Sequence, residues 1–356
     1  MSLPVPVVWS EDCLRHEPGG EVWLGQRDEG TEVPARARVL RDALTGAGAP
    51  LVAAAGYDDE VLRAVHDPLL IDHLAGLWPA WEQAGFPGRW GRDRAVPYVF
   101  PTAGMLAGLP VRTPAAIHGR AGLFCYDTMT LVGPGSWQAI RGAVDAAQTA
   151  ADLVSGGARL AYALCRPPGH HATASAYGGS CYLNNAAVAA QALRAAGAAR
   201  VAIIDIDAHH GNGTQMIFYQ RPDVWYGSLH VDPGAGWFPH YAGHADERGY
   251  GAGEGANRNL PLAPGLGDDG WLAALDVLCR EARATEPGAV VVSLGVDAAA
   301  ADPESPLQVT EAGYQEAGRR VAALAPTVWI QEGGYDLPSL GSLVVAILIG
   351  ATAGLR

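Results

Sequence analysis

The sequence predicts a single α/β domain in which helices cover both faces of a mostly parallel β-sheet. Hydrophobic residues make up 49% of the 356 residues and charged residues 17%, a globular composition long enough to bury a large core. In the second half, short continuous apolar segments alternate with helical patterns, as expected for a sheet covered on both faces. Clusters of His, Asp and Tyr follow four of these segments, where parallel sheets collect their ligands.

The first third of the chain gives the weaker signals. Apolar spacing of three and four predicts helices over residues 34–47 and 58–77. Residues 86–120 are rich in Gly and Pro and lack periodicity, so we expect a long surface excursion, a kind of loop that is often functional.

The remainder of the chain alternates clearly. Ala-rich and amphipathic patterns predict helices, and apolar runs between them predict strands. The helices are expected at 137–155, 184–195 and 271–284, and the strands at 160–164, 201–206, 224–230, 289–296 and 327–331. The apolar run 343–349 is shorter than the roughly 20 residues that span a bilayer, so a buried terminal helix is expected. No repeat or linker divides the chain, which predicts one domain over residues 1–356 with an insertion at about 86–120.

Charge and cysteine usage narrow the partners and the compartment. A formal net charge of −13 disfavours nucleic acid, which binds through Lys and Arg, and it would attract cationic substrates or simply keep the protein dispersed. The five cysteines are scattered and form no CxxC, which fits a reducing cytoplasm. The N-terminus shows no signal-peptide pattern, and we expect no membrane partner.

Three side chains predict a metal site. Asp207 and His209 are alternate residues just past a predicted strand, so they face the same side. Asp297, at the end of another strand, supplies the third ligand that a catalytic zinc site with one open position requires. Such residues taken singly are more often loop or capping residues, and only the joint pattern favours a metal. The ligand types suit Zn²⁺ and also Fe²⁺, Co²⁺ or Mn²⁺.

Three further residues predict the chemistry. His170 and His171 are adjacent in RPPGHHA, an arrangement suited to taking a proton from water and steadying charge beside a metal. Tyr335 follows two glycines in EGGYD, where its hydroxyl can donate to an oxyanion opposite the metal. In isolation, this tyrosine would read as a core residue.

Together these motifs resemble the arginase/deacetylase superfamily, and more closely histone deacetylases and bacterial acetylpolyamine amidohydrolases. The matching segments include RPPGHHA (166–172), GGSCYLNNAAVAA (178–190), DIDAHHGNGTQ (205–215), SLGVDAAAADP (293–303) and QEGGYD (331–336). The resemblance spans nearly the whole chain and implies the arginase/deacetylase fold. It assigns the metal to Asp207, His209 and Asp297. His170 matches the usual general base and His171 the second histidine, with their division of labour argued within the family, and Tyr335 matches the transition-state tyrosine.

The resemblance also implies several secondary sites. Residues 113–140 resemble the acetylpolyamine amidohydrolase branch, whose preceding excursion narrows the entrance and supports a homodimer. Asp127 matches a residue at the rim, Gly179 and Phe238 match the channel wall, and Arg36 matches an internal channel below the metal. A structural potassium site matches Asp205, Asp207, His209, Ser228 and Leu229. Two departures concern the substrate: Ser180 stands where an aromatic wall residue is usual, and the excursion lacks the glutamates that bind polyamines.

The expected function is the removal of acetyl groups from small N-acetylated amines, such as acetylpolyamines, by a zinc-dependent enzyme. Acetyl-lysine in proteins or peptides is the alternative substrate. An arginase- or agmatinase-like ureohydrolase needs a second metal, but position 211 is Gly and position 299 is Ala where its bridging carboxylates would stand. An inactive module that binds acetylated ligands should have lost a ligand, a histidine or the tyrosine, and all are present.

Overall fold

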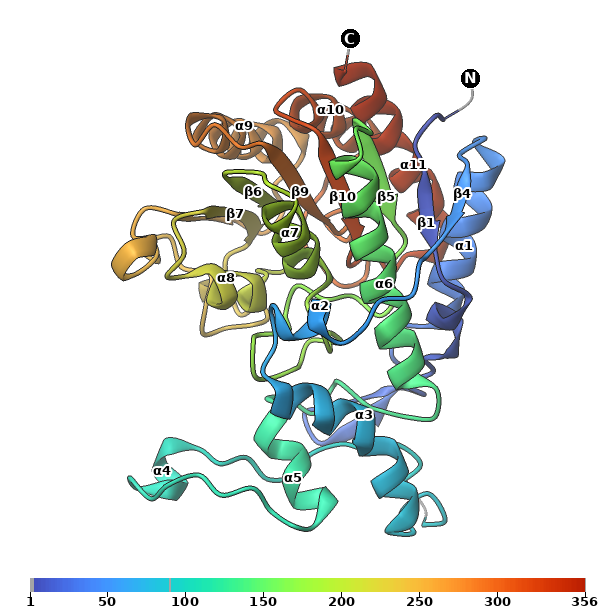
Figure 1. Ribbon diagram of the computed structural model, residues 1–356, viewed down its shortest axis with the longest axis vertical. Coiled ribbons are helices and arrows are strands. Elements are labelled where there is room, and N and C mark those ends of the chain that lie inside the picture. The colour runs from blue at the N-terminus through green and yellow to red at the C-terminus, as the bar shows by residue number, and fades with distance from the viewer. Residues whose placement is uncertain (1–2, 90, 356) are drawn as a thin grey trace.

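The computed structural model describes residues 3–89 and 91–355, and it is built on one eight-stranded sheet (Figure 1). The strand order is β4-β1-β5-β10-β9-β6-β7-β8, and every neighbouring pair is parallel. The strands are β1 (Val7–Trp9), β4 (Leu51–Ala53), β5 (Leu160–Ala163), β6 (Val201–Asp205), β7 (Val224–Val231), β8 (Asn257–Leu262), β9 (Ala289–Leu294) and β10 (Thr327–Gln331). The predicted α/β class is therefore confirmed.

Helices cover both faces of this sheet. One group, formed by α6 (Ser136–Ser155) and α7 (Asn185–Ala195), packs on β5, β6, β9 and β10. The other group forms a continuous layer in which each helix contacts the next. Its members are α1 (Pro34–Gly46), α11 (Leu337–Gly354), α10 (Glu311–Ala322) and α9 (Asp268–Ala284). The central strands are fully buried between the layers, which explains why they read as unbroken apolar runs.

A second apolar cluster lies beyond the carboxyl ends of the strands, around α3 (Pro68–Gln83) and α5 (Ile117–Phe124). The short helix α4 (Ala103–Leu106) projects from this end in Figure 1, within the predicted excursion. The remaining elements are the hairpin of β2 (Glu21–Trp23) and β3 (Gln26–Asp28), the helices α2 (Glu60–Arg63) and α8 (Asn212–Phe218), and the 3₁₀ turns η1 (Glu11–Arg15), η2 (Pro233–Ala235) and η3 (Gly251–Gly253).

The predicted helix over 58–77 is wrong, because the chain breaks between α2 and α3. Asp67 has extended backbone (φ −61°, ψ 131°), and its carboxylate accepts a hydrogen bond from the N–H of Leu69 as the cap of α3. Pro68 disfavours a helical conformation at the residue before it, so the Asp-Pro pair starts a new helix. The strands β1, β4 and β8 and the helix α10 were not predicted at all.

The buried terminal helix is confirmed as α11. It is long and apolar enough to cross a membrane by length and composition alone, but half of that stretch is buried inside the protein. It packs against α1 and α10 as a core helix. Two glycines make the contact with α10 close: a Cβ on Gly350 would lie 1.8 Å from the carbonyl oxygen of Gln315, and one on Gly318 would lie 1.9 Å from that of Ile347.

We predict that Gly350→Ala destabilises the protein, although alanine favours helices over glycine by up to about 1 kcal/mol. The new methyl group meets backbone that cannot move alone, and overpacking of this kind costs about 1–3 kcal/mol. The matched control is Gly76→Ala in α3, where a Cβ meets nothing within 4 Å and should be stabilising. Urea unfolding midpoints measure both, and shifts of the same sign would contradict the packing argument.

Candidate active site

The four polar clusters predicted at strand ends do converge, because β5, β10, β9 and β6 are consecutive neighbours in the sheet. Asp207 and His209 follow β6, and Asp297 follows β9. Their ligand atoms all lie within 4.8 Å of one another. His209 Nδ1 is 3.2 Å from Asp207 Oδ1 and 3.0 Å from Asp297 Oδ2.

A backbone amide donates to the second oxygen of Asp207 and of Asp297, the one that does not face His209 Nδ1. The N–H of Gly333 donates to Asp207 Oδ2 (2.8 Å), and the N–H of Ala208 donates to Asp297 Oδ1 (2.8 Å). Both carboxylates are buried, and neither pairs with an arginine or lysine of residues 3–89 or 91–355. Buried charges need a counter-charge, so two converging carboxylates and one imidazole fit a divalent cation well.

The two histidines differ in their surroundings. His170 Nδ1 lies 3.1 Å from Asp205 Oδ2, and its Nε2 lies 3.8 Å from Asp207 Oδ2. His171 lines the large cavity, and its Nδ1 lies 2.7 Å from Asn212 Oδ1. Burial, followed by the nearby rings of His170 and His209, holds the pKa of His171 well below its usual value. A neutral ring that donates from Nδ1 to Asn212 leaves Nε2 free to accept a proton.

Tyr335 lies at the wall of the same cavity, which has a volume of about 850 Å³. Its backbone N–H donates to the buried carboxylate of Asp302 (2.7 Å), which fixes the loop after β10. Burial raises the pKa of Tyr335 well above its usual value, so the hydroxyl stays protonated as a donor. The guanidinium of Arg36 stacks on the ring at 4.7 Å and donates to the carbonyl oxygens of Glu332 and Gly334. Arg36 thus lies beside Tyr335 and not among the residues that line the cavity.

The predicted channel residues also line the cavity. Gly179 has φ +58°, and a Cβ there would lie 2.5 Å from His171 Cδ2 and 2.9 Å from Phe238 Cε1, so only glycine fits. Phe238 meets His171 edge-on, with ring centroids 4.8 Å apart. Asp127 lines the cavity, but its carboxylate accepts hydrogen bonds from the N–H groups of Gly179 and Thr130. It therefore holds this wall in place.

Of the residues predicted for a structural cation, Asp205, Ser228 and Leu229 lie on the adjacent strands β6 and β7, and Asp207 and His209 follow β6. The register of β6 and β7 pairs Asp205 with Ser228, and Leu229 follows it; all three are fully buried. The carboxylate of Asp205 accepts hydrogen bonds from Tyr226 Oη (3.1 Å), besides its contact with His170. The Ser228 hydroxyl lies 2.7 Å from His230 Nδ1. These residues lie close together, but the contacts do not test for an ion, so the potassium site stays a prediction.

A family profile described as the histone deacetylase domain matches residues 31–350. The chain belongs to the histone deacetylase family. It is 42% identical to acetylpolyamine amidohydrolase 1 of Pseudomonas aeruginosa over 98% of this chain and 99% of that protein. It is 40% identical to the acetylpolyamine amidohydrolase of Mycoplana ramosa, over 97% and 98% of the two chains.

Solved structures of the histone deacetylase family agree with this assignment. The crystal structure of an acetylpolyamine aminohydrolase from Burkholderia pseudomallei superposes with a TM-score of 0.91 at 38% identity, over 98% of this chain and 99% of that one. The parallel sheet flanked by helices is thus the arginase/deacetylase fold, and the resemblance read from the motifs is confirmed.

Several residues that shape this site escaped the motif reading. Glu21 on β2 and Glu304 line the cavity, together with Phe100 from the predicted insertion. Glu21 lies in an N-terminal segment without periodicity, so no sequence signal marked it. Asp93, the one acidic residue that the insertion offered, forms an ion pair with Arg27 and does not line the cavity.

We predict that the protein binds about one divalent ion per chain and that Asp297→Asn weakens binding by more than about 100-fold, since even outer hydrogen-bond partners of metal ligands contribute 10- to 100-fold. Acid should release the ion, because carboxylate and imidazole ligands must be deprotonated to bind. Elemental analysis and chelator competition measure both effects. Asp246→Asn, at an exposed position, is the control and should keep the metal. Two ions per chain would point to a different centre.

Proposed function

We propose that this protein is a zinc-dependent amidohydrolase that removes the acetyl group from small N-acetylated amines, with acetylpolyamines as the leading class. The observation that carries the proposal is the composition of one cavity: it brings together His209 of the metal group, the neutral His171 and the Tyr335 hydroxyl. Relatives named acetylpolyamine amidohydrolases, similar over almost the full chain, support the amine class.

The chain's own groups account for the hydrolysis. Asp207, His209 and Asp297 would hold a divalent ion, which would supply a Lewis acid for the amide carbonyl and for water. The resemblance gave the general-base role to His170, but we assign it to His171, because His171 and not His170 lines the cavity. His171 accepts the proton of the attacking water at Nε2 and returns it to the leaving amine. Tyr335 donates a hydrogen bond to the oxyanion that forms on the carbonyl oxygen. His170, anchored by Asp205, steadies charge behind the reacting atoms.

The outer part of the cavity suits a cationic amine. Among its lining residues are three acidic side chains, Glu21, Asp127 and Glu304, and no lysine or arginine. Burial, then the charges of Glu304 and Asp28, raises the pKa of Glu21 to about 7. A carboxylate with a raised pKa and no cationic partner gains most from an incoming ammonium group. The β2 strand and the loop of Glu304 thus supply acidic residues where the insertion offers none.

Acetyl-lysine in a peptide remains the alternative substrate, because it carries the same acetamide at the end of a flexible alkyl chain and requires the same chemistry. The histone deacetylase domain profile favours it. Acetylputrescine, acetylspermidine and an acetyl-lysine peptide, compared on zinc- and iron-loaded enzyme, separate the two classes and the two metals. The chain contains no lysine, so its own side chains contribute no acetyl-lysine background.

We also propose the remaining features expected from the sequence: a structural potassium ion, a single domain with an insertion at 86–120, a cytoplasmic location and a homodimer. The five cysteines are buried free thiols, which supports a reducing compartment. The insertion exposes four large apolar side chains, which supports a subunit contact there. They are Tyr98, Met105, Leu109 and Val111.

We predict that Tyr335→Phe lowers kcat by about 100- to 1,000-fold, the loss typical of removing one oxyanion donor. Metal content should stay at the wild-type level, because the phenol is not a ligand. Steady-state kinetics and elemental analysis on the same preparation test this. An unchanged kcat would refute the assigned role of the hydroxyl.

We predict that Glu21→Gln and Glu304→Gln each raise KM for acetylputrescine by about 3- to 10-fold, the scale of a partly screened ion pair. Glu21 is charged only above its pKa of about 7, so the KM of the wild type should fall as pH rises through 7. Removing the charge of Glu304 should move that change to lower pH.

Neutral N-butylacetamide is the matched control substrate for the rim variants. Its KM should respond to neither substitution nor to this pH change. Equal effects on the neutral and cationic substrates would contradict the electrostatic role of the rim.

A further inference from the structure

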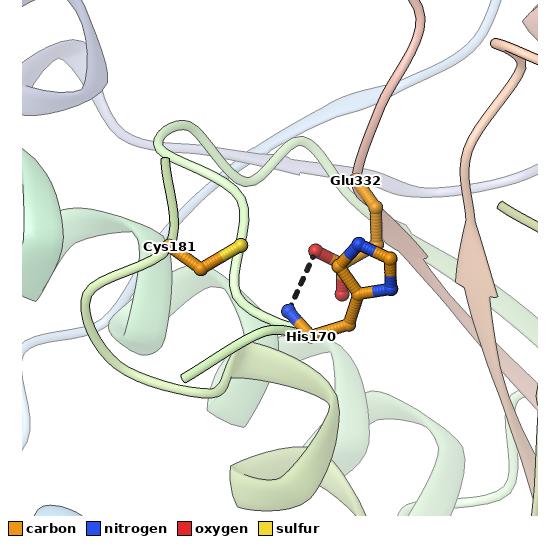
Figure 2. A group of neighbouring side chains, drawn as sticks. All are labelled: His170, Cys181 and Glu332. Atoms are coloured by element: carbon orange, nitrogen blue, oxygen red, sulfur yellow. Dashed lines mark hydrogen bonds between the residues drawn. The ribbon is translucent and has the colours of Figure 1, made fainter. Parts of the chain in front are cut away.

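The carboxylate of Glu332, directly after β10, connects two loops of the site. It is fully buried, and its Oε2 accepts hydrogen bonds from the N–H groups of Gly169 (2.6 Å) and His170 (3.2 Å). Figure 2 shows the second of these, with the His170 ring beside the carboxylate. Oε1 lies 3.4 Å from the hydroxyl of Ser293 on β9. One side chain thus connects the turn that carries Gly169 and His170, here called the histidine turn, to the centre of the sheet.

The backbone of Glu332 is fixed as firmly as its side chain. Its N–H donates to the carbonyl oxygen of Leu294, and its carbonyl oxygen accepts from Arg36 Nη2 at 2.5 Å. Tyr335 follows three residues later. Glu332 therefore relates the position of the histidine turn to that of the loop that carries Tyr335.

The histidine turn has little room to move on its own. A Cβ on Gly169 would lie 2.5 Å from the backbone nitrogen of Asn185 and 2.8 Å from the carbonyl oxygen of Leu183. The turn is thus packed against the start of α7 on one side, and Glu332 accepts its amides on the other. Two N–H groups that share one oxygen define the orientation of the turn, and with it the direction of the His170 ring toward Asp205.

A second metal site is the alternative explanation for this cluster, since ligand atoms of His170, Cys181 and Glu332 lie within 4.8 Å of one another (Figure 2). The hydrogen bonds argue against it. Both oxygens of Glu332 and the Nδ1 of His170 already have protein partners. Burial also raises the pKa of the Cys181 thiol well above its usual value, which keeps it protonated.

We propose that Glu332 is a positioning residue for deacetylation: by accepting the amides of Gly169 and His170 it fixes the His170 imidazole relative to Asp207 and to the Tyr335 loop. The inference rests on the proposed function, because it assigns His170 a part in the reaction. Misplacement of a reacting group by about 1 Å costs on the order of 100-fold in rate. The effect should fall on kcat and not on substrate binding.

The test compares four variants of the metal-loaded protein. Glu332→Ala removes the acceptor, and Glu332→Gln keeps an acceptor oxygen without the charge. Glu332→Asp keeps the charge but withdraws it by one methylene group. Ser293→Ala is the matched control, because it removes only the weak neighbour of Oε1. The measurements are kcat, KM, metal content and amide hydrogen exchange of the peptide 165–172.

We expect Glu332→Ala to lower kcat by about 100-fold with KM within about 3-fold of wild type, the signature of lost transition-state geometry. The kcat of Glu332→Gln should lie within about 10-fold of the wild-type value, since glutamine keeps an acceptor oxygen. Metal content should stay near wild type in all four variants. Exchange in 165–172 should be faster in the Ala and Asp variants but not in the Gln or Ser293→Ala variants.

Several results would overturn the proposal. A change in KM alone, equal losses in the Gln and Ala variants, or loss of metal would each exclude positioning through the amides. If Glu332→Ala does not fold, the Asp variant decides: full activity with slow exchange refutes the idea. An inactive wild type would refute the proposed function instead, and the exchange measurement would still test whether Glu332 holds the turn.

Discussion

The constraint on which this site depends is the burial of two carboxylates facing one imidazole. Asp207 and Asp297 lie within 3.2 Å of the same His209 nitrogen, in a part of the protein from which water is largely excluded. Two like charges placed so closely in a medium of low dielectric repel each other strongly. Backbone amides of Gly333 and Ala208 stabilise one oxygen of each. The other oxygen of Asp207 accepts the N–H of His209 (2.9 Å), but neither carboxylate pairs with an arginine or lysine among residues 3–89 and 91–355, so a divalent cation suits the position.

Other buried or half-buried carboxylates also accept backbone amides, in positions where no metal is expected. Asp127 accepts amides from the channel wall, Asp302 accepts the amide of Tyr335, and Glu332 accepts those of the histidine turn. Each carboxylate satisfies N–H groups that irregular loops would otherwise leave unpaired. Together they convert loops at the end of a sheet into rigid supports, which is what placing reacting groups accurately requires. The negative charge of the site thus serves structure as well as catalysis.

The sequence predicted the central part of the fold and the grouping of the polar site residues for a physical reason. Strands buried on both faces must be apolar throughout, and the residues at their ends, such as Asp207 and Asp297, are then the first polar side chains available. The outer strands carry less of this signal: β1 and the edge strand β4 have three residues each, and the edge strand β8 is only partly buried. The Asp67-Pro68 pair does signal a helix break, but the apolar spacing continues across it and favours one helix. The role of Glu21 could not be predicted from the sequence, because only folding brings the hairpin of β2 and β3 beside the cavity.

The inner part of the site, which the central strands fix, differs in this respect from the outer wall of the cavity. The metal group and the histidine turn are fixed by the central strands and by carboxylates that accept backbone amides, so their geometry follows from the fold. The outer wall is assembled from the β2–β3 hairpin, from Phe100 and from the loop of Glu304. Ser180 adds a small side chain to that wall. Under the proposed function, we expect substitutions there to alter which amine is bound without disturbing the groups that break the amide. No side-chain hydrogen bond of Glu21 or Glu304 reaches the expected metal ligands among the residues that the structure describes. The proposed function therefore makes substrate choice separable from the chemistry.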